Sequence, residues 1–200
     1  MIPENITAPG ADVRDFAINA AGPASNAFLA TGIHTFQAAM QFVAALPYGR
    51  NQDKENLCSI FTEGCGTCST KHALLWQLAH ENNFRGLRLM VGMFRMNGHN
   101  TPAVANTLRQ YLLPYMPEAH CYLRFEGRII DCTSARGGIL NFEAELLEEE
   151  EIQSGQIGDY KVRYHKAYLE EWLNRHPEVH LSPDELWAVR EQCIRNLSGE

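Results

Sequence analysis

The sequence predicts an α+β fold in which helices precede a small antiparallel sheet and two further helices complete the chain. Three observations support this prediction. Residues 68–81 have a strong helical pattern, and residues 87–133 contain strand patterns joined by turn residues. Residues 164–197 return to helical spacing. A single core typically occupies about 100 to 200 residues. The 200 residues therefore fit one core, expected over residues 1–135, and a helical extension over residues 136–200 that packs on it.

The helices before the sheet are predicted from apolar spacing and from caps. We expect residues 1–30, which are rich in Ala, Gly, Pro and Asn, to be loosely structured. Residues 35–45 carry apolar side chains on one face and end before Pro47, which indicates an amphipathic helix. The segment Cys68–Glu81 has the clearest apolar stripe, and Thr67 or Ser69 is suited to cap its start.

The strand patterns come next along the chain. Residues 87–96 form a buried-strand pattern, followed by a turn-rich loop that contains Asn97, His99 and Asn100. Two short strands over residues 119–125 and 128–133 are separated by Glu-Gly, which predicts a hairpin with a two-residue turn.

The predicted hairpin register decides which side chains share a face. It pairs His120 with Thr133 and Tyr122 with Asp131, so these four side chains project to one side. His120 and Asp131 then become diagonal neighbours within hydrogen-bond reach.

The last segments predict helices over residues 164–174 and 183–197, and the Glu run at 148–151 predicts a solvated acidic face.

Composition and charge narrow the class of protein. Hydrophobic residues make up 45% of the chain, which excludes global disorder, and a net charge of −7 argues against nucleic acid as a partner. Six unevenly spaced cysteines are not a disulfide scaffold and indicate a reducing compartment. The sequence shows neither a secretion signal nor an apolar membrane span. We therefore expect a cytoplasmic protein without membrane contact.

Cys68 is the first candidate for chemistry. At the beginning of a helix, its sulfur faces the positive end of the helix dipole, which favours the nucleophilic thiolate. The alternative is a small buried thiol that packs against the glycine turn. His120 and Asp131 suit a general base and the carboxylate that orients it, whereas the alternative is a surface His beside a surface Asp.

A rival interpretation uses the cysteines as metal ligands or as a redox pair. Cys65 and Cys68 form a CxxC pair, which Cys121 and Cys132 would complete as a zinc site. The hairpin argues against this site because Cys121 and Cys132 fall on its apolar face. A thioredoxin-like redox pair lacks the βαβ context that such a motif normally has.

Two sequence blocks resemble the transglutaminase-like superfamily. Gly-Thr-Cys-Ser-Thr-Lys-His-Ala-Leu-Leu at residues 66–75 is similar to its nucleophile helix, and Ala-His-Cys-Tyr-Leu-Arg-Phe-Glu-Gly-Arg-Ile-Ile-Asp-Cys-Thr at 119–133 is similar to its His and Asp strands. The resemblance implies a papain-like α+β fold with the nucleophile helix packed on an antiparallel sheet. It also implies that Cys68 is the nucleophile, His120 the general base and acid, and Asp131 the residue that orients His120.

The resulting hypothesis is a thiol hydrolase or acyltransferase that acts on a peptide, protein or small amide through a thioester and needs no cofactor. The sequence leaves open whether water or an amine accepts the acyl group. It also leaves open a catalytically inactive binding or scaffolding protein, or a zinc-binding module. Tyr48 and Asn51 are candidate oxyanion donors beside the Cys68 backbone N–H. Asn97, His99 and Asn100 are candidate substrate-binding residues because loops often carry binding groups.

Overall fold

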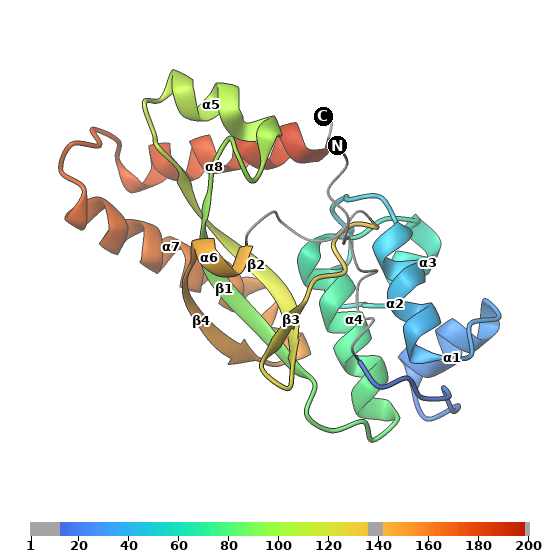
Figure 1. The fold of residues 1–200 in the computed structure, drawn as a ribbon. Helices are drawn as coiled ribbons and strands as arrows, with labels where there is room; N and C mark the ends of the chain where they lie inside the picture. Colours follow the sequence, from blue (N-terminus) through green and yellow to red (C-terminus); the bar gives the residue numbers. More distant parts are fainter. Residues whose placement is uncertain (1–12, 136–141, 199–200) are drawn as a thin grey trace, which may run out of the picture. The chain divides into compact units, whose positions relative to one another are not determined.

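The computed structural model describes residues 13–135 and 142–198 (Figure 1). These residues form two compact units. The first unit contains residues 13–90, 121–135 and 150–157. The second unit contains residues 91–120, 142–149 and 158–198. Residues 91–120 thus group with the C-terminal helices.

The strands form a four-stranded antiparallel sheet, which confirms the predicted α+β class. Its strand order is β3-β2-β1-β4, and the strands are β1 (Arg88–Met96), β2 (Met116–Phe125), β3 (Arg128–Ile130) and β4 (Leu146–Ile152). Eight α-helices accompany the sheet in the described residues, and the last two follow it along the chain. None of the described helices combines the length and the apolar character that a bilayer span requires.

The hairpin between β2 and β3 has the predicted register. Leu123 pairs with Ile130 and Phe125 with Arg128, and two residues connect the strands. Both turn residues have positive φ, 48° for Glu126 and 79° for Gly127, as a two-residue turn of type I′ requires. Strand β3 ends at Ile130, three residues earlier than predicted, because the backbone of the next residues bonds to side chains of a helix.

The first unit contains helices α1 (Pro23–Ala30), α2 (Phe36–Ala45), α3 (Ser59–Glu63) and α4 (Cys68–Glu81). Helices α2 and α4 confirm the two predicted helices, and Thr35 and Thr67 are their N-caps. Both α1 and α2 pack against α4, whose apolar side chains are buried.

Helix α1 corrects the expectation that the first 30 residues are loosely structured. Residues 1–12 lie outside the described part, but Pro23–Ala30 is helical, with proline at its start. The Glu81 carboxylate, at the end of α4, accepts hydrogen bonds from the backbone N–H groups of Ala24 and Ser25 at 3.1 and 2.7 Å. A side chain distant in sequence therefore satisfies the orphan donors of α1.

The second unit contains the 3₁₀ helix η1 (Pro102–Val104) and helices α5 (Ala105–Gln110), α6 (Phe142–Glu145), α7 (Asp159–Arg175) and α8 (Pro183–Ser198). Helices α7 and α8 confirm the two predicted C-terminal helices and pack against each other. Trp172 on α7 donates a hydrogen bond from its indole nitrogen to the Tyr115 hydroxyl at 2.9 Å. Arg190 on α8 forms a buried ion pair with Glu118.

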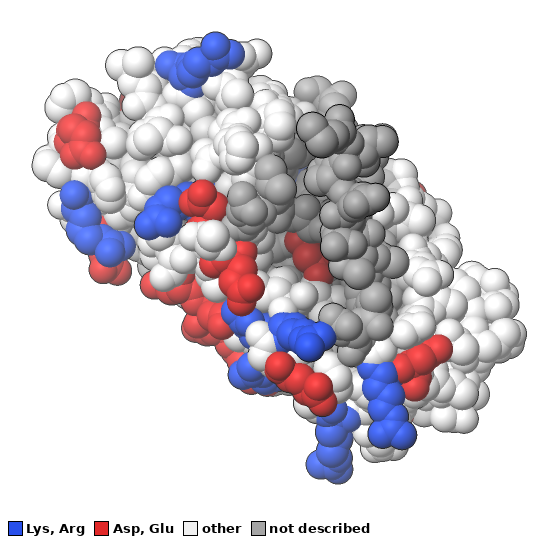
Figure 2. Space-filling model, in the orientation of Figure 1, with Lys and Arg blue, Asp and Glu red and all other residues white. Residues whose placement is uncertain are grey.

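Strand β4 carries the acidic run and lies at the edge of the sheet. Glu148, Glu149 and Glu151 are exposed, which confirms the expected solvated acidic face, and Figure 2 shows acidic side chains gathered over this strand. That these glutamates form a strand is not evident from the sequence. Charged side chains are a common protection of an edge strand against pairing with another chain.

Candidate active site

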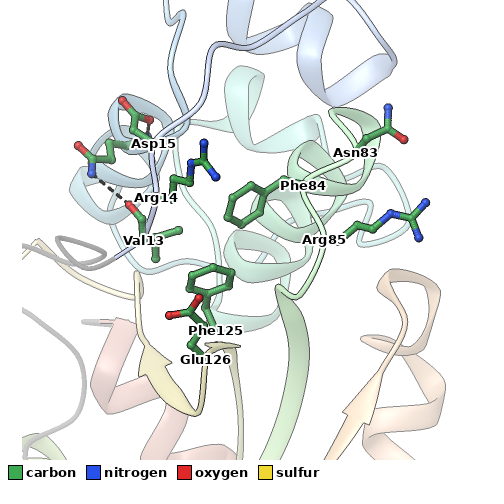
Figure 3. A pocket seen from close by; sticks show the side chains of 9 residues that line it. Val13, Arg14, Asp15, Asn83, Phe84, Arg85, Phe125 and Glu126 are labelled. Carbon is green, nitrogen blue, oxygen red and sulfur yellow. Dashed lines mark hydrogen bonds between the residues drawn. The ribbon is translucent and has the colours of Figure 1, made fainter.

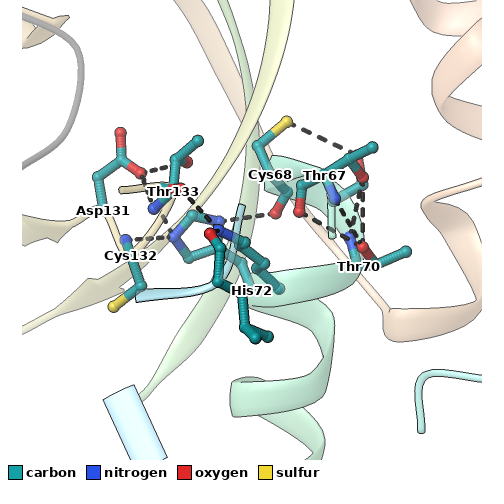
Figure 4. A network of polar contacts seen from close by, with 10 residues as sticks. Thr67, Cys68, Thr70, His72, Asp131, Cys132 and Thr133 are labelled. Atoms are coloured by element: carbon teal, nitrogen blue, oxygen red, sulfur yellow. Dashed lines mark hydrogen bonds and ion pairs between the residues drawn. The ribbon is translucent and has the colours of Figure 1, made fainter. Parts of the chain in front are cut away.

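Cys68 is the first residue of α4, at the position that the sequence predicts (Figure 4). The helix start is a capping box in which the Thr67 hydroxyl accepts from the Thr70 N–H at 3.3 Å and the Thr70 hydroxyl accepts from the Thr67 N–H at 3.0 Å. These bonds satisfy two donors of the first turn, and they fix the start of the helix at Cys68. Its side chain is buried, with the residue 6% exposed.

The loop before Cys68 is held closely against the first unit. The backbone N–H of Gly66 donates to the carbonyl of Pro47, and the N–H of Gly49 donates to the carbonyl of Gly66. Tyr48 forms a β-bridge with Gly66, so this candidate oxyanion donor lies on a segment bonded to the approach to Cys68. A Cβ on Gly66 would lie 3.1 Å from side-chain atoms of Ile60, Thr70 and Lys71, so the loop packs tightly at this glycine.

Asn51 is buried and supports the same loop. Its amide nitrogen donates to the Cys65 carbonyl at 3.0 Å and to the Glu63 carboxylate at 3.2 Å, and its oxygen accepts from the Thr70 hydroxyl at 2.7 Å. Both amide hydrogens are therefore engaged within the protein. An oxyanion role for Asn51 would require it to give up one of these bonds.

His72 is part of this network, and the sequence analysis did not identify it. Its Nδ1 donates to the Cys68 carbonyl oxygen at 2.7 Å, and its Nε2 accepts from the Cys132 backbone N–H at 2.7 Å. Because one nitrogen donates and the other accepts, the ring is a neutral imidazole with its proton on Nδ1. The i, i+4 spacing from Cys68 on α4 was the available signal.

Asp131 lies beside this ring, in the segment that follows β3. Its Oδ1 is 3.5 Å from His72 Nε2 and accepts hydrogen bonds from the Thr133 N–H at 2.9 Å and the Thr133 hydroxyl at 2.5 Å. The Asp131 side chain is 6% exposed. The structure thus brings Asp131 and the start of α4 together within the first unit, with His72 between them.

Lys71 is a second residue that the sequence analysis missed. It is fully buried, and its Nζ donates to the carbonyl oxygens of Leu46 at 2.6 Å and Thr133 at 2.8 Å. Burial lowers its pKa to about 8, against the opposing effect of Cys132, Asp131 and two other thiols. The only available signal was its position three residues after Cys68 on the same helix.

His120 belongs to the second unit, where it is buried. Its ring makes edge contacts with Phe94 and Phe142, at centroid distances of 6.0 and 5.1 Å. The residue after it, Cys121, belongs to the first unit, and its sulfur accepts a hydrogen bond from the Ser69 hydroxyl at 3.5 Å.

The candidate substrate-binding loop also belongs to the second unit. Asn97 Oδ1 accepts from the backbone N–H groups of His99 and Asn100, and Asn100 Oδ1 accepts from the Asn97 N–H. Asn100 also donates to the Arg95 carbonyl at 2.8 Å. The two asparagines therefore hold the loop together, and His99 is the exposed member of the three candidates.

The thiols differ in their surroundings, and all six cysteines are free. Burial raises the pKa of Cys58 and of Cys132, and it raises that of Cys193 to about 11. No three His, Cys, Asp or Glu side chains in the described ranges converge as ligands for a metal ion. The described residues thus give Cys65 and Cys68 no further zinc ligand.

A pocket of about 720 Å³ lies elsewhere in the first unit (Figure 3). Its lining includes Asn83 and Phe84, just beyond the end of α4, together with Phe125 of the hairpin. At 1.5 Å per residue, Asn83 is about 20 Å along the helix from Cys68. The lining contains no Cys, Ser or His. We therefore take the start of α4, and not this pocket, as the candidate site.

Comparisons of the chain with models of protein families, with curated proteins and with solved structures found no match. The candidate site therefore depends on the residues and geometry of this chain.

Proposed function

We propose that the chain is a thiol enzyme that cleaves or transfers an amide or related acyl group, with Cys68 as nucleophile. The observation that carries the proposal is the placement of Cys68 at the capped start of α4, in one unit with Asp131. A thiol at a helix N-terminus is favoured as the thiolate, because the dipole and the unpaired N–H groups of the first turn stabilise negative charge. The papain-like or transglutaminase-like form of the α+β fold is part of this proposal.

In the proposed reaction, Cys68 Sγ attacks the substrate carbonyl carbon while its proton passes to His120. The tetrahedral intermediate collapses, the carbon–nitrogen bond breaks, and His120 returns the proton to the leaving amine. Water or an amine then attacks the thioester and gives its proton to His120. The thiolate leaves, and it takes up that proton. The Cys68 backbone N–H is the proposed first oxyanion donor, because it belongs to the nucleophile residue at the start of the helix.

The first unit contains a histidine, His72, that lies beside Asp131. His72 is closer to Cys68 in sequence, but both of its ring nitrogens are engaged by backbone groups. A general base needs a nitrogen that can accept a proton from the nucleophile. We keep the base at His120, as the resemblance to the transglutaminase-like superfamily implies, with Asp131 as its orienting carboxylate.

A binding protein without turnover is the second candidate, and the burial of Cys68 favours it. A thiol only 6% exposed is typical of a structural cysteine. This alternative predicts that Cys68 resists alkylation, whereas the enzyme predicts that it reacts first.

Alkylation with iodoacetamide at about pH 6 tests the proposal, since an ordinary thiol with a pKa near 8.5 is largely protonated there. Mass spectrometry should find Cys68 modified fastest. Cys58 and Cys193, whose thiol pKa values burial raises, serve as internal controls. Peptide, glutamine-amide and small amide substrates should then be turned over by the wild type and not by Cys68→Ala. Labelling of Cys58 or Cys193 before Cys68 would refute the nucleophile assignment.

A further inference from the structure

Lys71 is a fully buried lysine, although lysine is almost never fully buried without partners. Its ammonium group has two carbonyl partners that lie on different segments, Leu46 after α2 and Thr133 after β3. The stem of the side chain passes so close to Gly66 that a Cβ there would lie 3.1 Å from Lys71 Cγ. The first unit therefore makes room for this side chain through a glycine and provides acceptors for its charge.

The residues after β3 explain what this arrangement achieves. Residues 131–133 follow the end of the β2–β3 ladder, so their backbone polar groups need other partners. Consecutive residues of α4 provide them: His72 accepts from the Cys132 N–H, and Lys71 donates to the Thr133 carbonyl. Thr133 in turn donates both its N–H and its hydroxyl to Asp131. Lys71 therefore bonds to Thr133, and Thr133 bonds to the Asp131 carboxylate that the proposed mechanism uses.

We propose that Lys71 is a positioning residue of the Cys68 site, whose ammonium group holds residues 131–133 against the start of α4. The inference deepens the proposed function and rests on it for the role of Asp131. We call this contact between the Lys71 ammonium group and residues 131–133 the clamp. It is a property of the fold and can be measured without any substrate.

The charge of Lys71 is part of the proposed role. The titratable groups that face it are Cys68 on α4, Cys65 in the preceding loop, and Asp131 and Cys132 after β3, and each of these favours the ammonium form. Burial outweighs them and lowers the Lys71 pKa to about 8, so the ammonium form predominates at pH 7 and is lost as pH rises through about 8. By reciprocity, the ammonium favours the thiolate of Cys68.

The test compares Lys71→Met with Lys54→Met, which removes the same charge from an exposed loop position. In folded Lys71→Met, hydrogen exchange of the Thr133 amide should accelerate at least tenfold relative to the Leu75 amide in the core of α4. The midpoint of the Cys68 alkylation rate against pH should also move up by about one unit, the lower end of the effect of a nearby opposite charge. Lys54→Met should leave both quantities at the wild-type value.

A measurement without substitution of Lys71 covers the case in which Lys71→Met does not fold. In the Cys65→Ser/Cys68→Ser variant, which lacks the two thiols that face Lys71 from α4 and the loop before it, the Thr133 amide resonance should shift between pH 7 and 9.5 with a midpoint near 8. Unchanged Thr133 exchange in folded Lys71→Met, or a Thr133 resonance that does not move, overturns the clamp. A lower melting temperature with an unchanged alkylation midpoint overturns the electrostatic role. If wild-type Cys68 is inert at acidic pH, the proposed function fails, while the exchange and resonance measurements still decide the clamp.

Discussion

His72 joins the start of α4 to the segment after β3: its Nε2 accepts from the Cys132 backbone N–H and its Nδ1 donates to the Cys68 carbonyl, both at 2.7 Å. The bond to Cys132 requires an unprotonated Nε2, so the ring is neutral although Asp131 Oδ1 lies 3.5 Å away. Protonation of His72 would gain an ion pair with Asp131 and lose the bond from Cys132. The side chain is thus a structural link between two segments that carry proposed catalytic residues.

The first prediction concerns this link. His72→Ala leaves the buried Cys132 N–H without its acceptor, removes the side-chain bond to the Cys68 carbonyl, and opens a cavity. We expect a loss of about 2 to 4 kcal/mol in the free energy of unfolding, measured by urea denaturation. His80→Ala, at an exposed position on the same helix, should cost less than about 1 kcal/mol. Equal effects of the two substitutions would show that the His72 bonds contribute little.

Local signals explain what the sequence predicts correctly. The start of α4 at Cys68 depends on a threonine cap and on apolar spacing within 14 residues. The hairpin register depends on two turn residues, Glu126 and Gly127. Both features are encoded by neighbouring residues, so pattern analysis finds them.

The features that the sequence did not predict depend on distant partners. From the sequence alone, Lys71 and His72 are expected to be polar residues of a helix surface. In the structure, Lys71 bonds to Leu46, 25 residues away, and His72 bonds to Cys132, 60 residues away. Strand β4 reads as a charge run because four consecutive glutamates hide any alternation. Helix α1 is short, and its cap is the side chain of Glu81, more than 50 residues further along the chain.

The second prediction concerns the hairpin turn. Gly127 has φ 79° and open space around it, so Gly127→Ala should be destabilising through backbone conformation alone. We expect a cost of about 1 kcal/mol in thermal or urea denaturation. Gly155→Ala is the matched control, since it also has open space but no positive φ, and it should change stability by less than about 0.5 kcal/mol. A Gly127→Ala protein as stable as the Gly155→Ala protein would contradict the type I′ turn.

The third prediction is a pH dependence in the second unit. His165 is buried, donates from Nε2 to the Pro117 carbonyl at 2.8 Å, and has its pKa lowered to about 4 by burial, with Arg190 acting in the same direction and Glu118 opposing. Between pH 4 and about 6.5 the unfolded chain binds the proton that the folded chain does not. The free energy of unfolding should therefore increase from pH 4 to 6.5, by about 3 kcal/mol from this group, and level off above.

Urea denaturation between pH 4.5 and 7 tests the contribution of His165. His165→Gln keeps a side-chain N–H donor but removes the titration, so the increase of stability with pH should become markedly smaller. His180→Gln, at an exposed position of the same unit, should retain the wild-type slope. If His165→Gln retains the full slope, other groups are responsible for the acid sensitivity.

The fourth prediction concerns the buried ion pair between Arg190 and Glu118. Arg190 Nε lies 2.8 Å from Glu118 Oε2, its Nη2 bonds to the other carboxylate oxygen, and the pair is largely buried. Glu118→Gln leaves the buried guanidinium with Glu191 as its remaining carboxylate partner, and we expect a loss of about 3 kcal/mol in the free energy of unfolding. The double variant Glu118→Gln/Arg190→Gln should lose less than the sum of the single variants.

The exposed pair Glu171–Arg175 on α7 is the matched comparison for the buried pair. Glu171→Gln should cost less than about 1 kcal/mol, because solvent screens exposed charges. Strict additivity in the Glu118–Arg190 double-mutant cycle would show that the two charges do not stabilise each other.

The last prediction distinguishes a working Asp131 from a purely structural one. Asp131→Asn preserves the oxygen that accepts from the Thr133 N–H and hydroxyl, so the fold should remain intact by circular dichroism. Without the carboxylate, the proposed imidazolium of His120 is less stable and its orientation is lost. Turnover of any substrate found should therefore fall by a factor on the order of 10² to 10⁴, and Cys68 alkylation near pH 6 should slow. Thr133→Val, which removes only the hydroxyl bonded to Asp131, should have a smaller effect on both rates. A folded Asp131→Asn protein with wild-type alkylation would mean that Asp131 anchors the loop and takes no part in activating Cys68.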